Sequence, residues 1–216
     1  MCTRDYAFAQ ECGPALPVET IHLPQDSRID TNTPVTLGQG ATMTILHADG
    51  AHHASFNENS IVLRLDLGGT RVLLEGDAEA GGRQAPTVPP SPSSIEGSLV
   101  TCCASELAAN ILIAAHHGSK TSSRRAFLDA VSASVFVVSS GPKKYQTVVL
   151  PDQQIISELA SRGQVFRTDV NDAACAANTA KIGPDADGKP GGCDNVRILL
   201  SGANPPQVAA FHTAEP

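Results

Sequence analysis

Short apolar runs bounded by glycine and polar residues recur along the middle of the chain. Two of them, residues 71–77 (RVLLEGD) and 110–119 (NILIAAHHGS), are typical of buried strands that end abruptly in polar groups. A third run, residues 61–67, is followed by Gly68-Gly69 and a further apolar stretch at 70–74. Because two glycines supply the positive φ of a tight turn, this pattern predicts a β-hairpin.

The rest of the pattern alternates between strands and helices. Residues 81–98 interrupt it with a Pro/Ser-rich insertion, which we expect to be a mobile surface loop, either a lid or a spacer. Strand–helix–strand alternation predicts an α/β fold (an α+β sandwich) with some parallel pairing. The expected elements are a bent strand or strand pair at 35–46, a helix at 124–131 capped from 119–123, a strand at 134–140, a helix from Pro151 at its first position to Gly163, a strand at 164–168, and closing strands at 195–201 and 207–212.

Three polar residues stand at the ends of the two clearest runs. Asp77 closes the first run, and His116 and His117 follow the second. If the two strands are parallel neighbours, these side chains emerge at the same carboxyl edge of the sheet, where open α/β folds place ligands. An unpaired buried charge costs several kcal/mol, so such a site needs a counter-charge or a cation. Carboxylate oxygen with imidazole nitrogen suits zinc, manganese or iron.

The order of these segments resembles a known family. Residues 57–65 (NENSIVLRL), 73–77 (LLEGD) and 111–119 (ILIAAHHGS) are similar to the second half of a metallo-β-lactamase-fold hydrolase, in the branch of the ComEC competence proteins. The likeness covers about residues 35–170 and implies a metallo-β-lactamase-like αββα fold. It also implies a phosphodiesterase or nuclease-like hydrolase with zinc or manganese, in up to two ions, that activates water.

In that family comparison each candidate residue has a role. Asp77 would bridge two metal ions, His116 would ligate, and His117 would ligate or assist proton transfer as the catalytic residue. The substrate would be a small-molecule or nucleic-acid phosphodiester.

The chain departs from the family in one important way. The main metal motif, His-x-His-x-Asp-His, should precede residue 57, but only His22, His47, His52 and His53 lie there and none has this spacing. Alanine also replaces the usual proline before His116. We therefore expect a hydrolase domain at 35–212 that is incomplete at its N-terminus, after an irregular segment at 1–34, with weak or absent metal binding. The alternative is a truncated or degenerate, non-catalytic module with a binding or assembly role.

Composition narrows the classes of partner. A net charge of −7 argues against non-specific binding to nucleic acid or anionic lipid, which needs clustered cations. No apolar run approaches the ~20 residues of a membrane span, and no signal peptide is visible. Among six cysteines, Cys175 and Cys193 are expected to form a disulfide, which would favour an extracytoplasmic location; the alternative is two free thiols. Cys102 and Cys103 are expected to pack in a helix rather than bond to each other.

Overall fold

A seven-stranded mixed sheet forms the centre of the computed structural model. The structure describes residues 32–48, 53, 55–141, 144–145, 147–170, 183–184, 190–191, 194–203 and 208–214. The strand order is β1-β2-β3-β4-β5-β6-β9. These strands are β1 (Val35–Gly38), β2 (Ala41–His47), β3 (Val62–Leu67), β4 (Thr70–Leu74), β5 (Ile111–Ile113), β6 (Val135–Val138) and β9 (Gln164–Arg167).

The sheet changes from antiparallel to parallel at β4. Strands β1 to β4 form two successive antiparallel hairpins, with Leu67 opposite Thr70 across the predicted Gly68-Gly69 turn. Strands β4, β5, β6 and β9 are parallel neighbours. The predicted parallel pairing of the two apolar runs is therefore confirmed, with Leu74 in register with Ile113.

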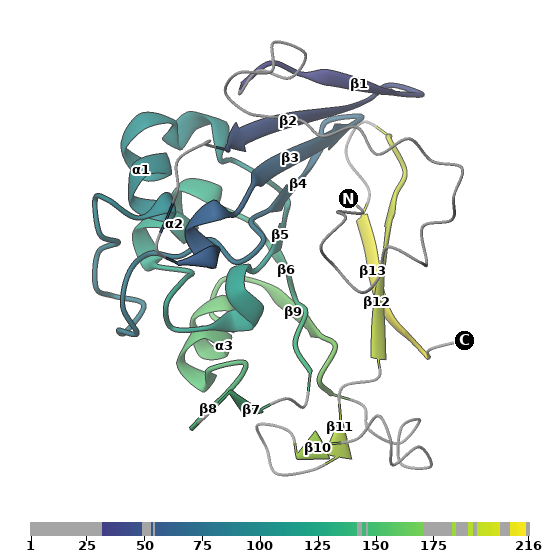
Figure 1. Cartoon of the computed structure of the whole chain (residues 1–216). Helices are drawn as coiled ribbons and strands as arrows, with labels where there is room; N and C mark the ends of the chain where they lie inside the picture. The colour runs from purple at the N-terminus through teal and green to yellow at the C-terminus, as the bar shows by residue number, and fades with distance from the viewer. Residues whose placement is uncertain are drawn as a thin grey trace, which may run out of the picture.

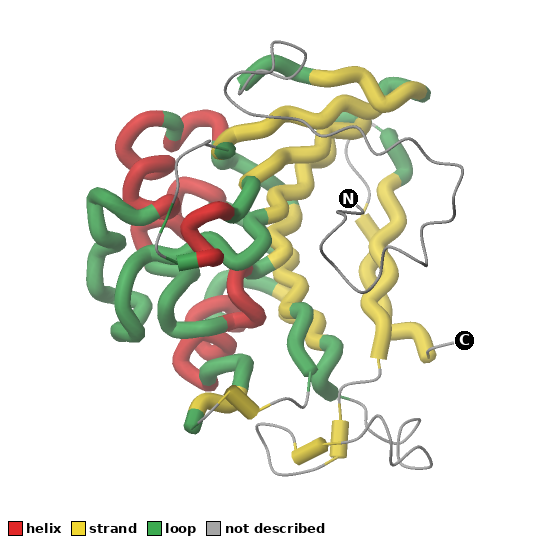
Figure 2. Tube along the Cα trace, viewed as in Figure 1, coloured by secondary structure: helices red, strands yellow, loops and turns green. Residues whose placement is uncertain are grey.

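Three helices cover one face of this sheet: α1 (Ile95–Cys102), α2 (Arg125–Val131) and α3 (Gln153–Ala160). All three lie on the same side of the strands (Figures 1 and 2). The hydrophobic core fills the space between them, and Leu73, Phe127 and Leu159 are fully buried within it. With no tryptophan and few aromatic residues in the chain, this core is built mainly from aliphatic side chains.

Two of the predicted helix starts are wrong in detail. Residues 119–123 do not cap α2, because its N-cap is Arg124, whose side chain makes no capping bond. Instead the Glu96 carboxylate of α1 accepts the backbone N–H groups of Ser123 and Arg124, so the capping group comes from another helix. Pro151 lies before the N-cap Asp152 of α3 rather than at its first position.

The Pro/Ser-rich insertion lies on the surface, as its composition predicts, but it is tied to the protein at several points. Residues 95–98 form the start of α1. The remainder is hydrogen-bonded to the segment around the start of α2: the Gln84 N–H donates to the Lys120 carbonyl, and the Pro86 carbonyl accepts from the Arg125 N–H. The Arg124 side chain, only 1% exposed, donates hydrogen bonds to the carbonyl oxygens of Gly82, Gln84 and Ala85. The buried Arg124 guanidinium therefore holds this segment in place by hydrogen bonds, because proline and serine side chains bury little apolar surface.

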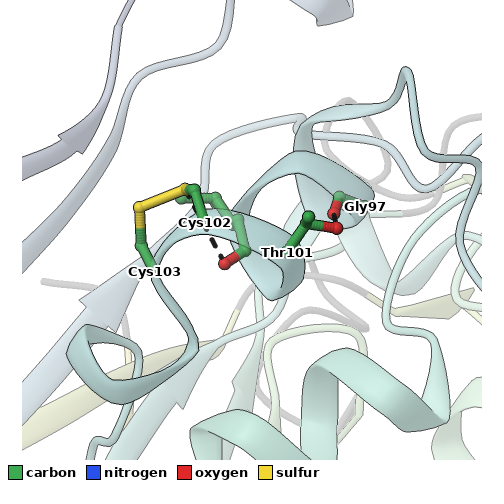
Figure 3. The surroundings of a disulfide bond; sticks show 5 residues. Gly97, Thr101, Cys102 and Cys103 are labelled. Carbon is green, nitrogen blue, oxygen red and sulfur yellow. Dashed lines mark hydrogen bonds between the residues drawn. A yellow bond between two sulfur atoms is a disulfide. The ribbon is translucent and has the colours of Figure 1, made fainter.

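The expectation for the vicinal cysteines is also wrong. Cys102 and Cys103 form a disulfide at the end of α1, next to the 3-10 turn η3 (Ala104–Glu106) (Figure 3). Thr101 Oγ1 donates to the carbonyl oxygen of Gly97 in the same helix. The predicted Cys175–Cys193 pair lies outside the described residues.

A separate two-stranded sheet lies on the face of the main sheet opposite the helices (Figure 1). The predicted closing strands are confirmed as the antiparallel hairpin of β12 (Asp194–Leu200) and β13 (Val208–Ala214), which approaches β9 (Figure 1). Further two-residue strands are β7 (Lys144–Tyr145), β8 (Val148–Val149), β10 (Gly183–Pro184) and β11 (Pro190–Gly191). The predicted mixed α/β class, an α+β sandwich, is confirmed. Within the described ranges, none of the helices has the length and apolar content to cross a bilayer.

Candidate functional site

The candidate residues meet because β4 and β5 are parallel and end at the same edge. Asp77 follows β4 by three residues, and the 3-10 turn η4 (Ala115–Gly118) follows β5 and carries His116 and His117. The His116 N–H donates to the Gly76 carbonyl at 3.0 Å, which ties the two strand-end loops together. The edge of a parallel sheet is where α/β proteins usually bind ligands.

All three candidate residues line one pocket of ≈ 340 Å³. This volume lies at the small end of the ~300–1,000 Å³ range of small-ligand sites. The pocket is lined by Asn57, Asp77, Arg83, His116, His117, Ser119, Thr121, Val148 and Leu150. The structure therefore brings together the residues that the sequence singled out, although their roles stay predictions.

The His117 imidazole has one ring nitrogen fixed by the protein and the other directed to Asp77. Its Nδ1 lies 2.7 Å from the Ser139 carbonyl oxygen, which only accepts, so Nδ1 carries the proton of the neutral ring. Its Nε2 lies 3.7 Å from Asp77 Oδ1. In this tautomer a lone pair on Nε2 faces a carboxylate oxygen, so a metal cation between the two atoms would be bound by both.

His116 is held in a similar way. Its Nδ1 lies 3.0 Å from Glu79 Oε1 and 2.8 Å from Thr121 Oγ1. The same Glu79 oxygen accepts a hydrogen bond of 3.1 Å from the Asn57 side chain. Both imidazoles thus have Nδ1 beside an oxygen acceptor, as in metal-ligating histidines, which usually donate their second N–H to a carboxylate or a carbonyl.

Sequence reasoning missed Glu79 and Arg83. Glu79 stands two residues beyond Asp77, and its position beside a strand end was a signal that could have been used. Arg83 gave no such signal, because it lies in the Pro/Ser-rich insertion and reaches the pocket only through the folding of that segment. Asn57, the first residue of the segment 57–65 that carries the family resemblance, also lines the pocket.

The backbone of the histidine turn is unusual. His116 (φ 47°), His117 (φ 55°) and Gly118 (φ 74°) are three consecutive residues in the left-handed region. Non-glycine residues pay of order 1–3 kcal/mol for such a conformation, and it persists where surrounding contacts determine it, often at functional sites. Gly118 is also required sterically, because a Cβ there would lie 2.7 Å from Pro151 Cβ.

Two carboxyl groups outside the pocket, Glu75 and Glu96, are fully buried. Glu75 is fully buried and its oxygens make no hydrogen bond with the described residues. Burial, and then the charge of Glu96, raises the pKa of Glu75 well above its usual range. Burial also raises the pKa of Glu96 to about 7, although its bonds from the Arg124 and Ser123 N–H groups act in the opposite direction. Neither group lines the pocket, and of the two only Glu96 is hydrogen-bonded to the segment that leads into α2.

The other upstream histidines do not join the site in the described part of the chain. His47 ends β2, and His53 Nδ1 lies 3.8 Å from Glu58 Oε2; neither is among the pocket residues. His22 and His52 lie outside the described residues.

The donor set fits a metal ion in part. Nitrogen and carboxylate oxygen suit zinc or manganese, and the separation of His117 Nε2 from Asp77 Oδ1 is compatible with one ion of ~2.0–2.2 Å bond length touching both. The described residues contain no group of three or more His, Cys, Asp or Glu side chains that could hold a metal. A catalytic zinc usually has three protein ligands, so these residues make up an incomplete site.

Comparison with known proteins relates part of the chain to a competence protein. No family model matches the chain. Over 119 residues, 54% of this chain, it is 34% identical to "Competence protein ComA" of Neisseria gonorrhoeae, but the match spans only 15% of that protein. The predicted likeness to competence proteins is therefore confirmed at this coarse level, while the metallo-β-lactamase fold and hydrolase activity stay predictions. Over about half its length, the chain is similar to a small part of a competence protein.

Proposed function

We propose that this chain carries part of a metal-dependent phosphodiesterase site and that the whole protein has a role related to competence. The observation that best supports the site is the arrangement of the two imidazoles, each with Nδ1 beside an oxygen acceptor. This leaves the Nε2 atoms available for a ligand. The partial similarity to a competence protein supports the second part of the proposal.

In this proposal Asp77 and His117 would hold the ion, zinc or manganese, since Asp77 Oδ1 and His117 Nε2 lie 3.7 Å apart. His116 would join them only in the complete site, because the described residues alone form no group of three such side chains that could hold a metal. A bound divalent cation supplies Lewis acidity and neutralises charge on a phosphoryl group. Glu79 and the Ser139 carbonyl fix the orientation of the two rings. Since Nδ1 of His117 is committed to Ser139, the same Nε2 atom serves either as a ligand or as a proton carrier, and not as both at once. The remaining ligands would come from outside the described residues.

Metal binding and hydrolysis should be measured together. We expect zinc or manganese to bind the purified protein weakly and Asp77→Ala to weaken this binding at least about 10-fold, because Asp77 is the only charged one of the three proposed ligands. Hydrolysis of bis(p-nitrophenyl) phosphate should fall in parallel. Asp129→Ala is the matched control, since Asp129 is 62% exposed and pairs only with Arg162 in the described residues.

A second candidate is a non-catalytic binding or assembly module that keeps the hydrolase-like arrangement. It is favoured by the contacts of His116, whose Nδ1 has both Glu79 and Thr121 as partners without any ion. A protein that binds no zinc or manganese, hydrolyses no phosphodiester and is unaffected by Asp77→Ala would establish this alternative over the enzyme.

A further inference from the structure

Arg83 brings a positive charge into the pocket. Among the described lining residues it is the only one that is always cationic. Its Nη2 donates to both carboxylate oxygens of Asp152, at 2.6 and 2.8 Å, and its Nη1 donates to Ser119 Oγ at 3.2 Å. No described residue accepts a bond from Nε, so the guanidinium keeps donor capacity for a further partner.

The position of Arg83 is fixed from both sides. Its segment is held to the protein by Arg124, through the Gly82, Gln84 and Ala85 carbonyls that flank it. Asp152 also accepts the Lys120 N–H at 2.8 Å, so the ion pair is anchored to the turn that follows the histidines. A guanidinium held in this way is preorganised, because little side-chain entropy remains to be lost on binding.

The positive charge of Arg83 matters for an anionic ligand because carboxylates lie in and beside the pocket. Asp77 lines the pocket, so an anionic ligand meets a carboxylate there, and the Glu79 carboxylate lies close by, 3.0 Å from His116 Nδ1. A fixed guanidinium offsets this repulsion, and its planar donors match the oxygens of a phosphate. A neutral phosphate ester would not gain this electrostatic attraction from Arg83.

We propose that Arg83 is the residue that selects anionic phosphodiesters, by binding a non-reacting oxygen of the phosphate. This inference rests on the proposed function and adds the specificity residue to it. Asp152 then acts as an internal competitor, because its carboxylate shares the guanidinium with the ligand and lowers its effective charge.

Two substitutions separate this role from a purely structural one. Arg83→Gln removes the cation, and Asp152→Asn removes the competing anion but keeps an oxygen that accepts the Lys120 N–H. Both break the same ion pair. If Arg83 were only a structural clamp, the two variants would weaken the site together, whereas a ligand-binding Arg83 predicts opposite effects.

The test uses the full chain in EDTA and follows amide chemical shifts during titration with two probes of similar shape. Dimethyl phosphate is an anionic diester, and trimethyl phosphate is its neutral counterpart. We expect the anion to bind about 10-fold or more tightly than the neutral ester, Arg83→Gln to remove this preference, and Asp152→Asn to increase it several-fold. Arg83→Lys should keep part of the preference, and it also controls for folding.

Three results of the titration would overturn the inference: no measurable dimethyl phosphate binding, an anion preference that survives Arg83→Gln, or Arg83→Gln and Asp152→Asn shifting affinity in the same direction. Since the titration contains no metal, it is independent of catalysis. An anion preference without hydrolysis would overturn only the proposed enzyme, and hydrolysis whose KM is insensitive to Arg83→Gln would overturn only the role of Arg83.

Discussion

The buried Arg124 side chain should determine whether the segment that carries Arg83 stays in place. Arg124→Met keeps the aliphatic length of the side chain and removes three hydrogen bonds to the carbonyls of Gly82, Gln84 and Ala85. Charge-assisted bonds contribute about 1.5–3 kcal/mol each, but the mutation also removes the cost of burying a guanidinium, which is several kcal/mol. We expect a net loss of about 3 kcal/mol in the free energy of unfolding.

Arg125→Met is the matched control for this prediction. Arg125 is adjacent in sequence and 51% exposed, and solvent screens its ion pair with Glu158, so its loss should cost much less than the loss of Arg124. Denaturant unfolding gives the two stabilities. Hydrogen exchange over residues 80–94 and the rate of tryptic cleavage after Arg83 show whether the segment detaches locally. The reasoning fails if Arg124→Met is no more damaging than Arg125→Met and exchange in this segment is unchanged.

Three further predictions concern α1 and its ends. The raised pKa of Glu96, about 7 in the folded chain, means that its contribution to stability is complete below pH about 4.5 and is lost as the pH rises through 7. Glu96→Gln should therefore make the decline in denaturant midpoint between pH 5 and 7 shallower, and an unchanged slope would contradict this assignment. Gly97→Ala should cost about 1–3 kcal/mol in thermal unfolding, because the new Cβ would lie 1.9 Å from the Ser91 carbonyl oxygen, and a neutral result would show that the backbone relaxes freely. Cys103→Ser should lower stability by about 1 kcal/mol or less, since the Cys102–Cys103 disulfide closes almost no chain, and a larger loss in the same assay would give it a structural role.

Different elements of the chain supply different chemical groups to the pocket at one edge of the sheet. Parallel strands β4 and β5 deliver a carboxylate and two imidazoles to the pocket, and the insertion after Asp77 delivers a cation. Glu96 and Arg124 lie outside the pocket and join α1, the insertion and the start of α2. Perturbing this support should therefore change ligand binding without touching any pocket residue.

The strands and the polar residues at their ends could be predicted from the sequence. Apolar runs of four to seven residues between glycines have few structural solutions, and a Gly-Gly turn fixes which neighbours pair. That local information was enough to predict the β3–β4 hairpin and to place Asp77 near His117 once parallel pairing was assumed.

The tertiary structure decided the features that depend on contacts between distant segments. The composition of residues 81–98 predicts disorder, because local propensity carries no record of a buried guanidinium from residue 124 that satisfies its carbonyls. For the same reason Arg83 could not be assigned to the pocket, nor Glu96 to the cap of α2. Periodicity reports which face of an element is apolar, whereas the partners of buried polar groups are chosen by the packing of the whole chain.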